Sequence, residues 1–415
     1  MKAYFRTFGC RANQYDTEAA RAMIVRAGGT IVATPDEADV AVFNSCAVTS
    51  EAEADLRQAV RRDAARNPGL RSIVMGCAAA RDDGAIALLP GVHAVVRGAD
   101  MTALAVALGV DARLARSRAA IQTGSRALLR IQDGCDEHCT FCATTLARGP
   151  HRSRVTDELV NEAIMLADQH PEIVLTGVHI GSYGSDAGSS LGALVERLVR
   201  DVPRVRFRLS SVEATEVDPC LQELLAGEPS RLVPHLHAPL QSGSDRVLKR
   251  MGRHWYTSGT YARAVDRVVG GRSVFALGAD IIAGFPGETA EDHLATLALA
   301  RALPFTYLHV FPYSGRPGTS ADRLGARVPP PVAKQRAAEL RAVGAQRTAA
   351  YRAARSGGDA DVVVIGEGQK RGGLTEDYLS VELSDAALPR RTRFAARLLA
   401  SGTGLVASAY DRPVM

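Results

Sequence analysis

Three closely spaced cysteines most narrowly limit what this chain of 415 residues can fold into. Cys135, Cys139 and Cys142 follow the pattern C-x3-C-x2-C, directly after a predicted strand at residues 128–131. Three thiolates at this spacing fit three irons of a [4Fe-4S] cluster and leave one iron open to a small ligand. The alternative is a zinc or purely structural site, although zinc sites usually show paired C-x2-C motifs and four ligands.

Three further cysteines are scattered, but each closely follows a predicted strand. Cys10, Cys46 and Cys77 come after apolar segments at the start of the chain, at residues 2–8, 38–43 and 72–75. The carboxyl ends of parallel strands share one edge of a sheet, so these thiols can converge on one cluster. The alternative is three buried, unreactive thiols. Cys220 belongs to neither set, and we expect it to be structural. An odd total of seven cysteines argues against a disulfide framework.

The hydrophobic periodicity predicts an α/β protein with three folded parts. Residues 1–112 alternate strands and helices, which predicts a doubly wound α/β domain, and residues 113–126 predict a linker. Residues 127–330 hold six strand candidates with helical stretches between them, which predicts a partial (β/α)6 barrel. The strand candidates of this barrel are residues 128–131, 173–176, 205–210, 233–238, 279–283 and 306–310.

The remaining residues predict a basic helix and a small β-barrel. Residues 331–358 follow three consecutive prolines and carry six basic side chains against one acidic side chain, which predicts a basic helical connector. Residues 359–415 alternate with period two between Gly-rich turns, which predicts a small antiparallel β-barrel. No apolar run approaches the roughly 20 residues that cross a bilayer, and the first residues lack a signal peptide's apolar core. We therefore expect a cytoplasmic protein that does not enter a membrane.

The clustered motif resembles that of the radical S-adenosylmethionine superfamily, with Phe141 at the usual aromatic position before the last cysteine. In that family the open iron binds S-adenosylmethionine, and an electron from the cluster cleaves it to a 5′-deoxyadenosyl radical. The resemblance implies no side chain acting as catalytic acid or base, because the cofactor carries the chemistry. Matching segments at the predicted strand ends imply these S-adenosylmethionine-binding residues: Phe141, Thr176, Gly177, Ser211, Glu213, Gln241, Ile282 and Gly284.

The scattered cysteines resemble the N-terminal motifs of the methylthiotransferase family. The similar motifs are Thr7-x-Gly9-Cys10-x-x-Asn13-Gln14, Asn44-Ser45-Cys46 and Gly76-Cys77. The resemblance covers essentially the whole chain and implies a radical S-adenosylmethionine barrel followed by a TRAM-like β-barrel. It also implies that Cys10, Cys46 and Cys77 hold a second [4Fe-4S] cluster, which carries or supplies sulfur. The implied cofactors are therefore two [4Fe-4S] clusters and S-adenosylmethionine.

Residues 9–18, 131–135 and 308–319 resemble one branch of that family, which acts on threonylcarbamoyladenosine in tRNA. This implies methylthiolation of carbon 2 of that base, next to the anticodon, with S-adenosylmethionine serving as both methyl donor and radical source. The implied partners are tRNA, an electron donor such as a flavodoxin or ferredoxin, and a sulfur donor. Residues 143–149 depart from the pattern, because the proline usual in the family before Arg148-Gly149 is missing.

Other functions remain open from the sequence. The family also contains enzymes for isopentenyl-adenosine tRNA and for an aspartate of a ribosomal protein, and a non-catalytic iron–sulfur RNA-binding protein is a remote alternative. For tRNA phosphates we expect arginine contacts. The candidates are Arg148, Arg152, Arg154, Arg341, Arg347 and Arg352. For the last three, the alternative is a solvated helix face. The tail, residues 359–415, carries seven basic against eight acidic side chains and does not by itself predict RNA binding.

Overall fold

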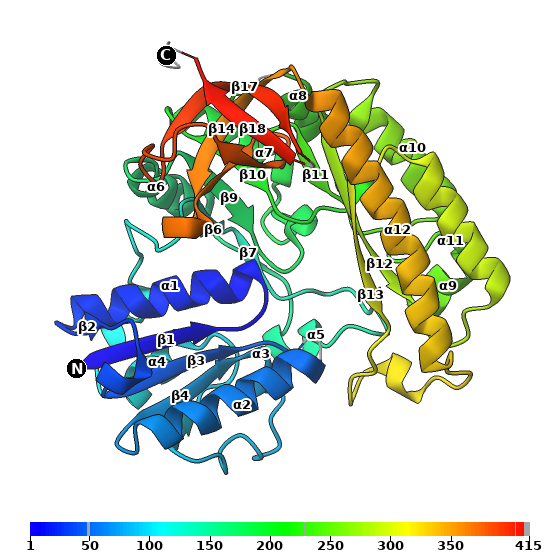
Figure 1. Cartoon of the computed structure of the whole chain (residues 1–415). Coiled ribbons are helices and arrows are strands. Elements are labelled where there is room, and N and C mark those ends of the chain that lie inside the picture. The colour runs from blue at the N-terminus through cyan, green and yellow to red at the C-terminus, as the bar shows by residue number, and fades with distance from the viewer. Residues whose placement is uncertain (48–49, 228–229, 403, 411–415) are drawn as a thin grey trace. The chain divides into compact units, whose positions relative to one another are not determined.

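The computed structural model describes residues 1–47, 50–227, 230–402 and 404–410, and the chain forms two compact units (Figure 1). The first unit comprises residues 1–122, 132–152 and 314–322. The second comprises residues 123–131, 153–313 and 323 onward. The units interleave along the chain, because the segment with Cys135, Cys139 and Cys142 packs with the first unit. The domain boundaries proposed from the sequence stay a prediction.

A five-stranded parallel sheet organises the first unit. Its strand order is β2 (Thr30–Ile31), β1 (Lys2–Thr7), β3 (Val40–Ser45), β4 (Arg71–Gly76) and β5 (Val92–Val95). The helices are α1 (Arg11–Arg26), α2 (Ser50–Arg66), α3 (Cys77–Ala80), α4 (Met101–Leu108) and α5 (Thr144–Arg148). The α/β fold predicted for this region is confirmed. The short edge strand β2 escaped sequence analysis because two residues are too few to show a period.

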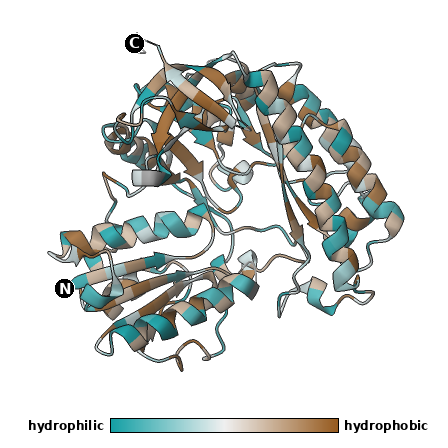
Figure 2. Ribbon diagram, in the orientation of Figure 1, coloured by the Kyte–Doolittle hydropathy of each residue, from teal (hydrophilic) through white to brown (hydrophobic). Residues whose placement is uncertain are grey.

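The central strand of this sheet is buried on both faces, which explains its nearly continuous apolar sequence. Successive side chains alternate between two apolar clusters, with Phe43 in one and Val42 in the other. Figure 2 shows the same pattern as hydrophobic strands flanked by helices α1 and α2 with many hydrophilic positions. Helix α4 begins at the N-cap Asp100, whose carboxylate accepts from the backbone N–H of Thr102 at 3.0 Å.

Six parallel strands form the partial barrel of the second unit. They are β6 (Ala127–Arg130), β9 (Glu172–Thr176), β10 (Arg206–Leu209), β11 (His235–His237), β12 (Ala276–Ala283) and β13 (Tyr307–Pro312). Sheets β10-β9-β6 and β11-β12-β13 are linked by isolated parallel bridges from Phe207 to Leu232 and from Ser211 to His237. The helices that pair with these strands are α6 (Thr156–Ala167), α7 (Leu191–Asp201), α8 (Pro219–Gly227), α9 (Asp245–Arg250), α10 (Ser258–Val269) and α11 (Ala290–Ala302). The predicted six-stranded arrangement is confirmed.

Helix α12 (Pro330–Arg355) runs alongside β13 and packs on the barrel (Figure 1). It begins after Pro329, where proline fixes a backbone angle suited to a helix start. Ala337, Leu340 and Val343 belong to the barrel's apolar core, so one face of this basic helix is buried.

The chain ends in a small closed barrel with the strand order β14-β15-β16-β18-β17. Its strands are β14 (Asp359–Ile365), β15 (Gly372–Thr375), β16 (Ser380–Leu383), β17 (Arg393–Ser401) and β18 (Gly404–Ala409). The predicted small β-barrel is confirmed, but purely antiparallel pairing was wrong. β16 and β18 pair in parallel, because β17 intervenes in sequence between these two neighbours in the barrel.

A buried ionic cluster joins this small barrel to the larger one. The fully buried Glu172 carboxylate receives Arg206 Nε at 2.7 Å and Arg208 Nε at 2.8 Å. Arg206 also pairs with Asp361 of β14, with its Nη1 3.0 Å from Asp361 Oδ2. Arg208 donates to the backbone oxygen of Thr375 at 3.0 Å. Burial alone would raise the pKa of Glu172, but the arginines hold it well below its usual value.

Among the described residues, no helix combines the length and the apolar character that crossing a membrane requires.

We predict that Glu172→Gln destabilises the second unit. Removing one partner of a buried ion pair typically costs about 3–5 kcal/mol, because the remaining charges stay buried. Urea denaturation should show this loss at neutral pH, whereas Glu382→Gln, on an exposed position of β16, should change little. The pKa of Glu172 is depressed in the folded protein. The difference in free energy of unfolding between the wild type and Glu172→Gln should therefore persist as the pH falls to the usual glutamate pKa, and shrink only at lower pH. An unchanged urea concentration at the unfolding midpoint of Glu172→Gln would contradict the stabilising role of this ion pair.

Candidate iron–sulfur and cofactor sites

Cys10, Cys46 and Cys77 lie at the carboxyl ends of three neighbouring strands. Cys10 follows β1 and caps helix α1, Cys46 follows β3, and Cys77 follows β4 and opens helix α3. Since β1, β3 and β4 are adjacent and parallel, their ends lie at the same edge of the sheet. The structure therefore brings together three thiols that are 36 and 31 residues apart in sequence.

The Asn13 side chain lies among these thiols. Its Oδ1 is 3.6 Å from Cys10 Sγ and 3.9 Å from Cys77 Sγ. Its Nδ2 donates to the backbone oxygens of Ser45 at 2.7 Å and Phe8 at 3.1 Å. Because both Nδ2 partners are carbonyl oxygens, the orientation of the amide is fixed and Oδ1 faces the sulfurs.

Two glycines let the strand ends approach closely enough to form this site. Gly9 has φ +102°, and a Cβ there would lie 2.6 Å from Cys46 Cβ and 2.8 Å from its Sγ. Gly76 has φ +97°, and a Cβ there would collide with Asn44 and with the backbone of Ser45. Each glycine directly precedes a cysteine, so the backbone around the thiols admits no side chain at these positions.

Burial raises the pKa of the Cys77 thiol to about 11, and the nearby Cys10 and Cys46 add to this shift. Arg148 opposes it by its charge and hydrogen bond. A thiol with such a pKa is a poor free nucleophile at neutral pH, whereas coordination to a metal removes its proton. Cys77 therefore suits a metal ligand better than a reactive cysteine.

The second cysteine set occupies the loop between β7 (Gln132–Asp133) and α5. Cys142 N donates to Cys139 O at 3.1 Å, and Cys135 N donates to Gly149 O at 3.1 Å. Cys142 Sγ accepts from the backbone N–H of Thr144 at 3.3 Å, an interaction that stabilises a thiolate. All three cysteines are half-buried.

Each set supplies three thiols, the number of protein ligands that leaves one iron of a [4Fe-4S] cluster open. In the part of the chain that the structure describes, the group of three metal-ligating atoms within 4.8 Å of one another is His237, Asp280 and His309. That Cys10, Cys46 and Cys77 hold one [4Fe-4S] cluster, and Cys135, Cys139 and Cys142 the other, stays a prediction. Cys220 lies near the start of α8, outside both sets.

Most residues proposed for S-adenosylmethionine lie at strand ends of the second unit. Thr176 ends β9 and is followed by Gly177, while Ser211 bridges to His237 beyond β10. Ile282 N donates to Gln241 O at 2.9 Å, which ties the loop after β11 to β12. These are the carboxyl ends at which parallel barrels bind their ligands. Phe141 lies in the first unit.

The backbone adopts positive φ at two of these positions, and this conformation is strained at Gln241 but not at the glycine. Gln241 has φ +64°, which is uncommon for a residue other than glycine and is typical of functional sites. Gly284 has φ +76°, and its N–H donates to the Glu288 carboxylate at 3.1 Å.

Glu213 is held in place by aromatic and cationic neighbours. Its carboxylate pairs with Arg253 and accepts from Trp255 Nε1 at 2.6 Å. Burial raises its pKa, while Arg253 opposes the shift. Glu213 is therefore oriented by neighbouring side chains, and any contact with a cofactor stays a prediction.

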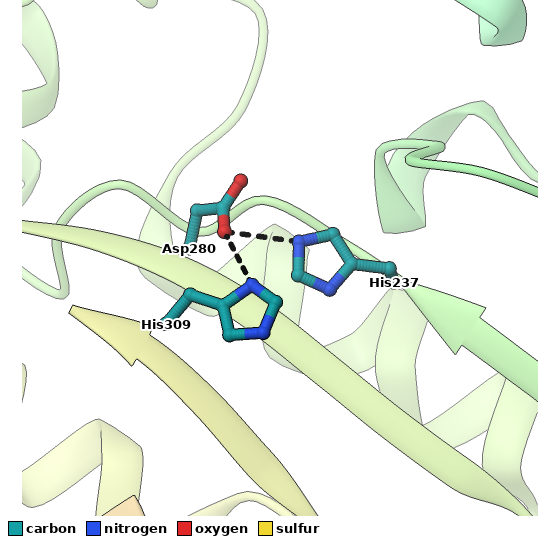
Figure 3. A group of neighbouring side chains, drawn as sticks. All are labelled: His237, Asp280 and His309. Carbon is teal, nitrogen blue, oxygen red and sulfur yellow. Dashed lines mark ion pairs between the residues drawn. The ribbon is translucent and has the colours of Figure 1, made fainter. Parts of the chain in front are cut away.

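A polar cluster inside the barrel was not singled out from the sequence. His237, Asp280 and His309 come from β11, β12 and β13 and point toward one another (Figure 3). Asp280 Oδ1 is 3.0 Å from His237 Nε2 and 3.3 Å from His309 Nδ1. Burial would raise the pKa of Asp280, but hydrogen bonds from both histidines hold it below its usual value. The available signal was three polar side chains within otherwise apolar strands.

A tyrosine hydroxyl extends this polar cluster. Tyr307 OH lies 3.1 Å from His237 Nδ1 and 2.8 Å from His235 Nε2. These hydrogen bonds orient the His237 ring, so its Nε2 faces Asp280.

The arginines proposed for RNA differ in their placement. Arg148 is buried among Asp16, Asp133 and Cys77, so its guanidinium is not presented to solvent as a phosphate contact requires. The sequence interpretation of Arg148 was wrong for this reason. Arg154 pairs with Glu162 at 2.8 Å, and Arg152 is exposed. Arg341 donates to Val310 O at 2.8 Å and Arg347 donates to Arg301 O, while Arg352 is half-buried on the same helix. RNA contacts by these other arginines stay a prediction.

We predict that Gly76→Ala removes the cluster held by Cys10, Cys46 and Cys77, because a Cβ at that position collides with the neighbouring strand end. Reconstituted protein should lose about four of about eight irons per chain, since each [4Fe-4S] site holds four. Gly84→Ala is the matched control: it has φ +106° but open space around its Cα. Equal iron contents for the two variants would contradict the role of close approach.

The chain matches two described families. Residues 2–98 match the "Uncharacterized protein family UPF0004" and residues 129–300 match the "Radical SAM superfamily". Among solved structures, it is similar to the radical S-adenosylmethionine methyltransferase TsrM from Kitasatospora setae, which has cobalamin and a [4Fe-4S] cluster bound. That match has a TM-score of 0.58 and 14% identity, and covers 77% of this chain and 76% of the other, so it supports the fold alone.

Curated relatives match over nearly the whole chain. Threonylcarbamoyladenosine tRNA methylthiotransferase MtaB of Aquifex aeolicus is 33% identical, covering 92% of this chain and 96% of its own. MtaB of Bacillus subtilis is 36% identical, with 84% and 81% covered. The tRNA-2-methylthio-N(6)-dimethylallyladenosine synthase of Methylobacillus flagellatus is 32% identical, with 89% of each chain covered. With both cysteine sets placed at strand ends and loops as described, the chain belongs to the radical S-adenosylmethionine methylthiotransferase family.

Proposed function

We propose that this protein methylthiolates carbon 2 of N6-threonylcarbamoyladenosine in tRNA, next to the anticodon. The observation that carries the proposal is the convergence of Cys10, Cys46 and Cys77 at three adjacent strand ends, in a chain that also contains the C-x3-C-x2-C loop. A radical enzyme without sulfur insertion would need only the second set. Similarity to MtaB over most of the chain supports the same conclusion.

The bound cofactors would supply one-electron cleavage of S-adenosylmethionine at the Cys135 set and sulfur at the Cys10 set. The protein's own residues hold and orient these groups. Cys135, Cys139 and Cys142 would hold three irons of a cluster and leave the fourth open, and residues at the strand ends from Thr176 to Gly284 would hold S-adenosylmethionine. Neither task requires a side chain to act as an acid or base.

A polar cluster on three barrel strands lies near residues proposed for the cofactor. His237 is on β11, Asp280 is on β12 with Ile282, and His309 is on β13, while Gln241 lies in the loop after β11. A threonylcarbamoyl group carries a hydroxyl, an amide and a carboxylate, which can hydrogen-bond to such side chains. Both histidines already bond to Asp280, so the choice of threonylcarbamoyladenosine over dimethylallyladenosine rests on the similarity to MtaB.

The proposed partners are tRNA, a low-potential electron donor of the flavodoxin or ferredoxin class, and a sulfur donor. The need for the electron donor follows from the reductive cleavage step. The need for the sulfur donor follows from the inserted sulfur atom. Because tRNA is the substrate, we propose that the protein acts in the cytoplasm.

We predict different losses from the two cysteine sets. Replacing Cys135, Cys139 and Cys142 together with Ala should halve the iron content and abolish 5′-deoxyadenosine release, because the open iron is lost. Replacing Cys10, Cys46 and Cys77 together should also halve the iron but retain 5′-deoxyadenosine release while stopping formation of methylthio product. Iron analysis and chromatography of the anaerobic reaction measure both results. If the second variant folds and yet releases no 5′-deoxyadenosine, the division of roles fails.

We predict that the tRNA of a strain lacking this gene identifies the substrate. Mass spectrometry of its nucleosides should show loss of the 2-methylthio form of threonylcarbamoyladenosine and accumulation of the unmodified form. The wild-type gene should restore the product, and the variant lacking Cys10, Cys46 and Cys77 should not. Loss of methylthio-dimethylallyladenosine instead would assign the protein to the other tRNA branch. Unchanged tRNA would point to a protein substrate.

A further inference from the structure

The most extensively bonded side chain near the N-terminal cysteines is an arginine that follows the other cysteine set. Arg148 Nε lies 3.4 Å from Cys77 Sγ, and its Nη2 donates to both Asn13 Oδ1 at 2.7 Å and Asp16 Oδ2 at 2.8 Å. A further contact joins it to Asp133 Oδ1 at 3.0 Å. Only 2% of this side chain is exposed, so these contacts are shielded from water.

The backbone fixes Arg148 in this position. It is the last residue of α5, and its neighbour Ala147 is part of the apolar core of the first unit. Helix α5 packs against α3, the helix that Cys77 opens. The planar fork of a guanidinium can serve a thiol, an amide and two carboxylates at once, which a lysine cannot.

Charge explains why this site needs the arginine. Asp16 is buried beside the thiols, with 1% of its side chain exposed. A cluster held by three thiolates would add further negative charge next to it, at the buried Cys46 and Cys77 and the exposed Cys10. Arg148 is the cation that meets Asp16, Asp133 and Cys77 together. Without it, the buried carboxylate and the thiolates would repel each other at low dielectric.

We propose that Arg148 sets the reduction potential of the cluster held by Cys10, Cys46 and Cys77. Hydrogen bonds to cluster sulfurs and nearby charge are the main levers on such potentials. An N–H donated to Cys77 Sγ and a buried positive charge both stabilise the reduced cluster, which carries one more electron. Arg148 therefore raises the potential of this cluster.

The sulfur contact that the structure gives for the set of Cys135, Cys139 and Cys142 differs from the contact between Arg148 and Cys77. Cys142 Sγ receives a neutral backbone N–H, from Thr144. The cluster at Cys135, Cys139 and Cys142 must be strongly reducing to cleave S-adenosylmethionine, so a buried cation beside it would oppose its task. Raising the potential of the N-terminal cluster relative to the other separates the two in energy, and one can then be reduced before the other.

This inference rests on the proposed function through the assignment of the N-terminal cluster. The test uses the full chain with Cys135, Cys139 and Cys142 changed to Ala, so that only that cluster remains. Anaerobic redox titration followed by electron paramagnetic resonance gives its midpoint. At a fixed potential, Arg148→Gln should raise the ratio of oxidised to reduced cluster at least tenfold. For a one-electron couple this corresponds to a midpoint potential lowered by about 59 mV or more. Arg148→Lys keeps the charge and should recover part of the shift.

Two controls separate tuning from packing. Arg57→Gln removes an exposed arginine on helix α2 of the same unit and should leave the midpoint unchanged. Asp16→Asn removes a negative charge and should move the midpoint upward, opposite to Arg148→Gln. A downward shift for Asp16→Asn would identify a packing effect and overturn the proposal.

The remaining outcomes are also decisive. Retained iron with an unchanged midpoint in Arg148→Gln would overturn the proposal. So would loss of the iron in both Arg148→Gln and Arg148→Lys, since the arginine would then serve assembly alone. If Arg148→Gln loses its iron but Arg148→Lys keeps it, the midpoint of the Arg148→Lys cluster becomes the test. A midpoint equal to that of the protein with Arg148 intact would overturn the proposal. Absence of iron in the triple-Ala background with Arg148 intact would remove the N-terminal cluster itself, and the proposed function with it.

Discussion

The parallel arrangement of strands is the constraint on which both candidate regions depend. In a parallel sheet every strand ends at the same edge, so residues that follow separate strands meet there. The first unit uses this edge to gather Cys10, Cys46 and Cys77. The second unit places Thr176, Gln241 and Gly284 near the corresponding edge of its barrel, where we propose that S-adenosylmethionine binds. Each region is therefore assembled from short loops on a rigid scaffold, which is the usual way to hold cofactors precisely.

Two buried networks keep these regions in shape, and both are centred on arginine. Glu172 of β9 holds Arg206 and Arg208 of β10, which reach β14 and β15, and so ties the terminal barrel to the larger one. Arg148 joins the end of the Cys135–Cys142 loop to the thiols of the other set. Both networks are satisfied by several hydrogen bonds, as buried charges require. The two sites are thus fixed by polar contacts that removing one partner would disrupt.

A polar cluster on three barrel strands is distinct from the cysteines proposed for radical generation. The cysteines and strand ends suit any member of the family, whereas His237, Asp280 and His309 join β11, β12 and β13 through ion pairs, with about half of the His309 side chain exposed. Tyr307 extends this cluster by its hydrogen bond to His237. We propose that substrate preference depends on such side chains and not on the clusters.

The sequence by itself determined the order of most helices and strands, and it predicted the candidate ligands. Spacing alone identified the C-x3-C-x2-C loop, and period-two or apolar runs identified the strands before Cys10, Cys46 and Cys77. Local signals failed at short or glycine-rich elements, such as β2 and β15, and at the parallel pairing of β16 with β18. Only the tertiary structure decided the partners of Arg148, which lie 132 residues away at Asp16 and 71 away at Cys77. Periodicity in the sequence indicates which face of an element is buried. It does not indicate which distant side chain contacts that face in the folded protein.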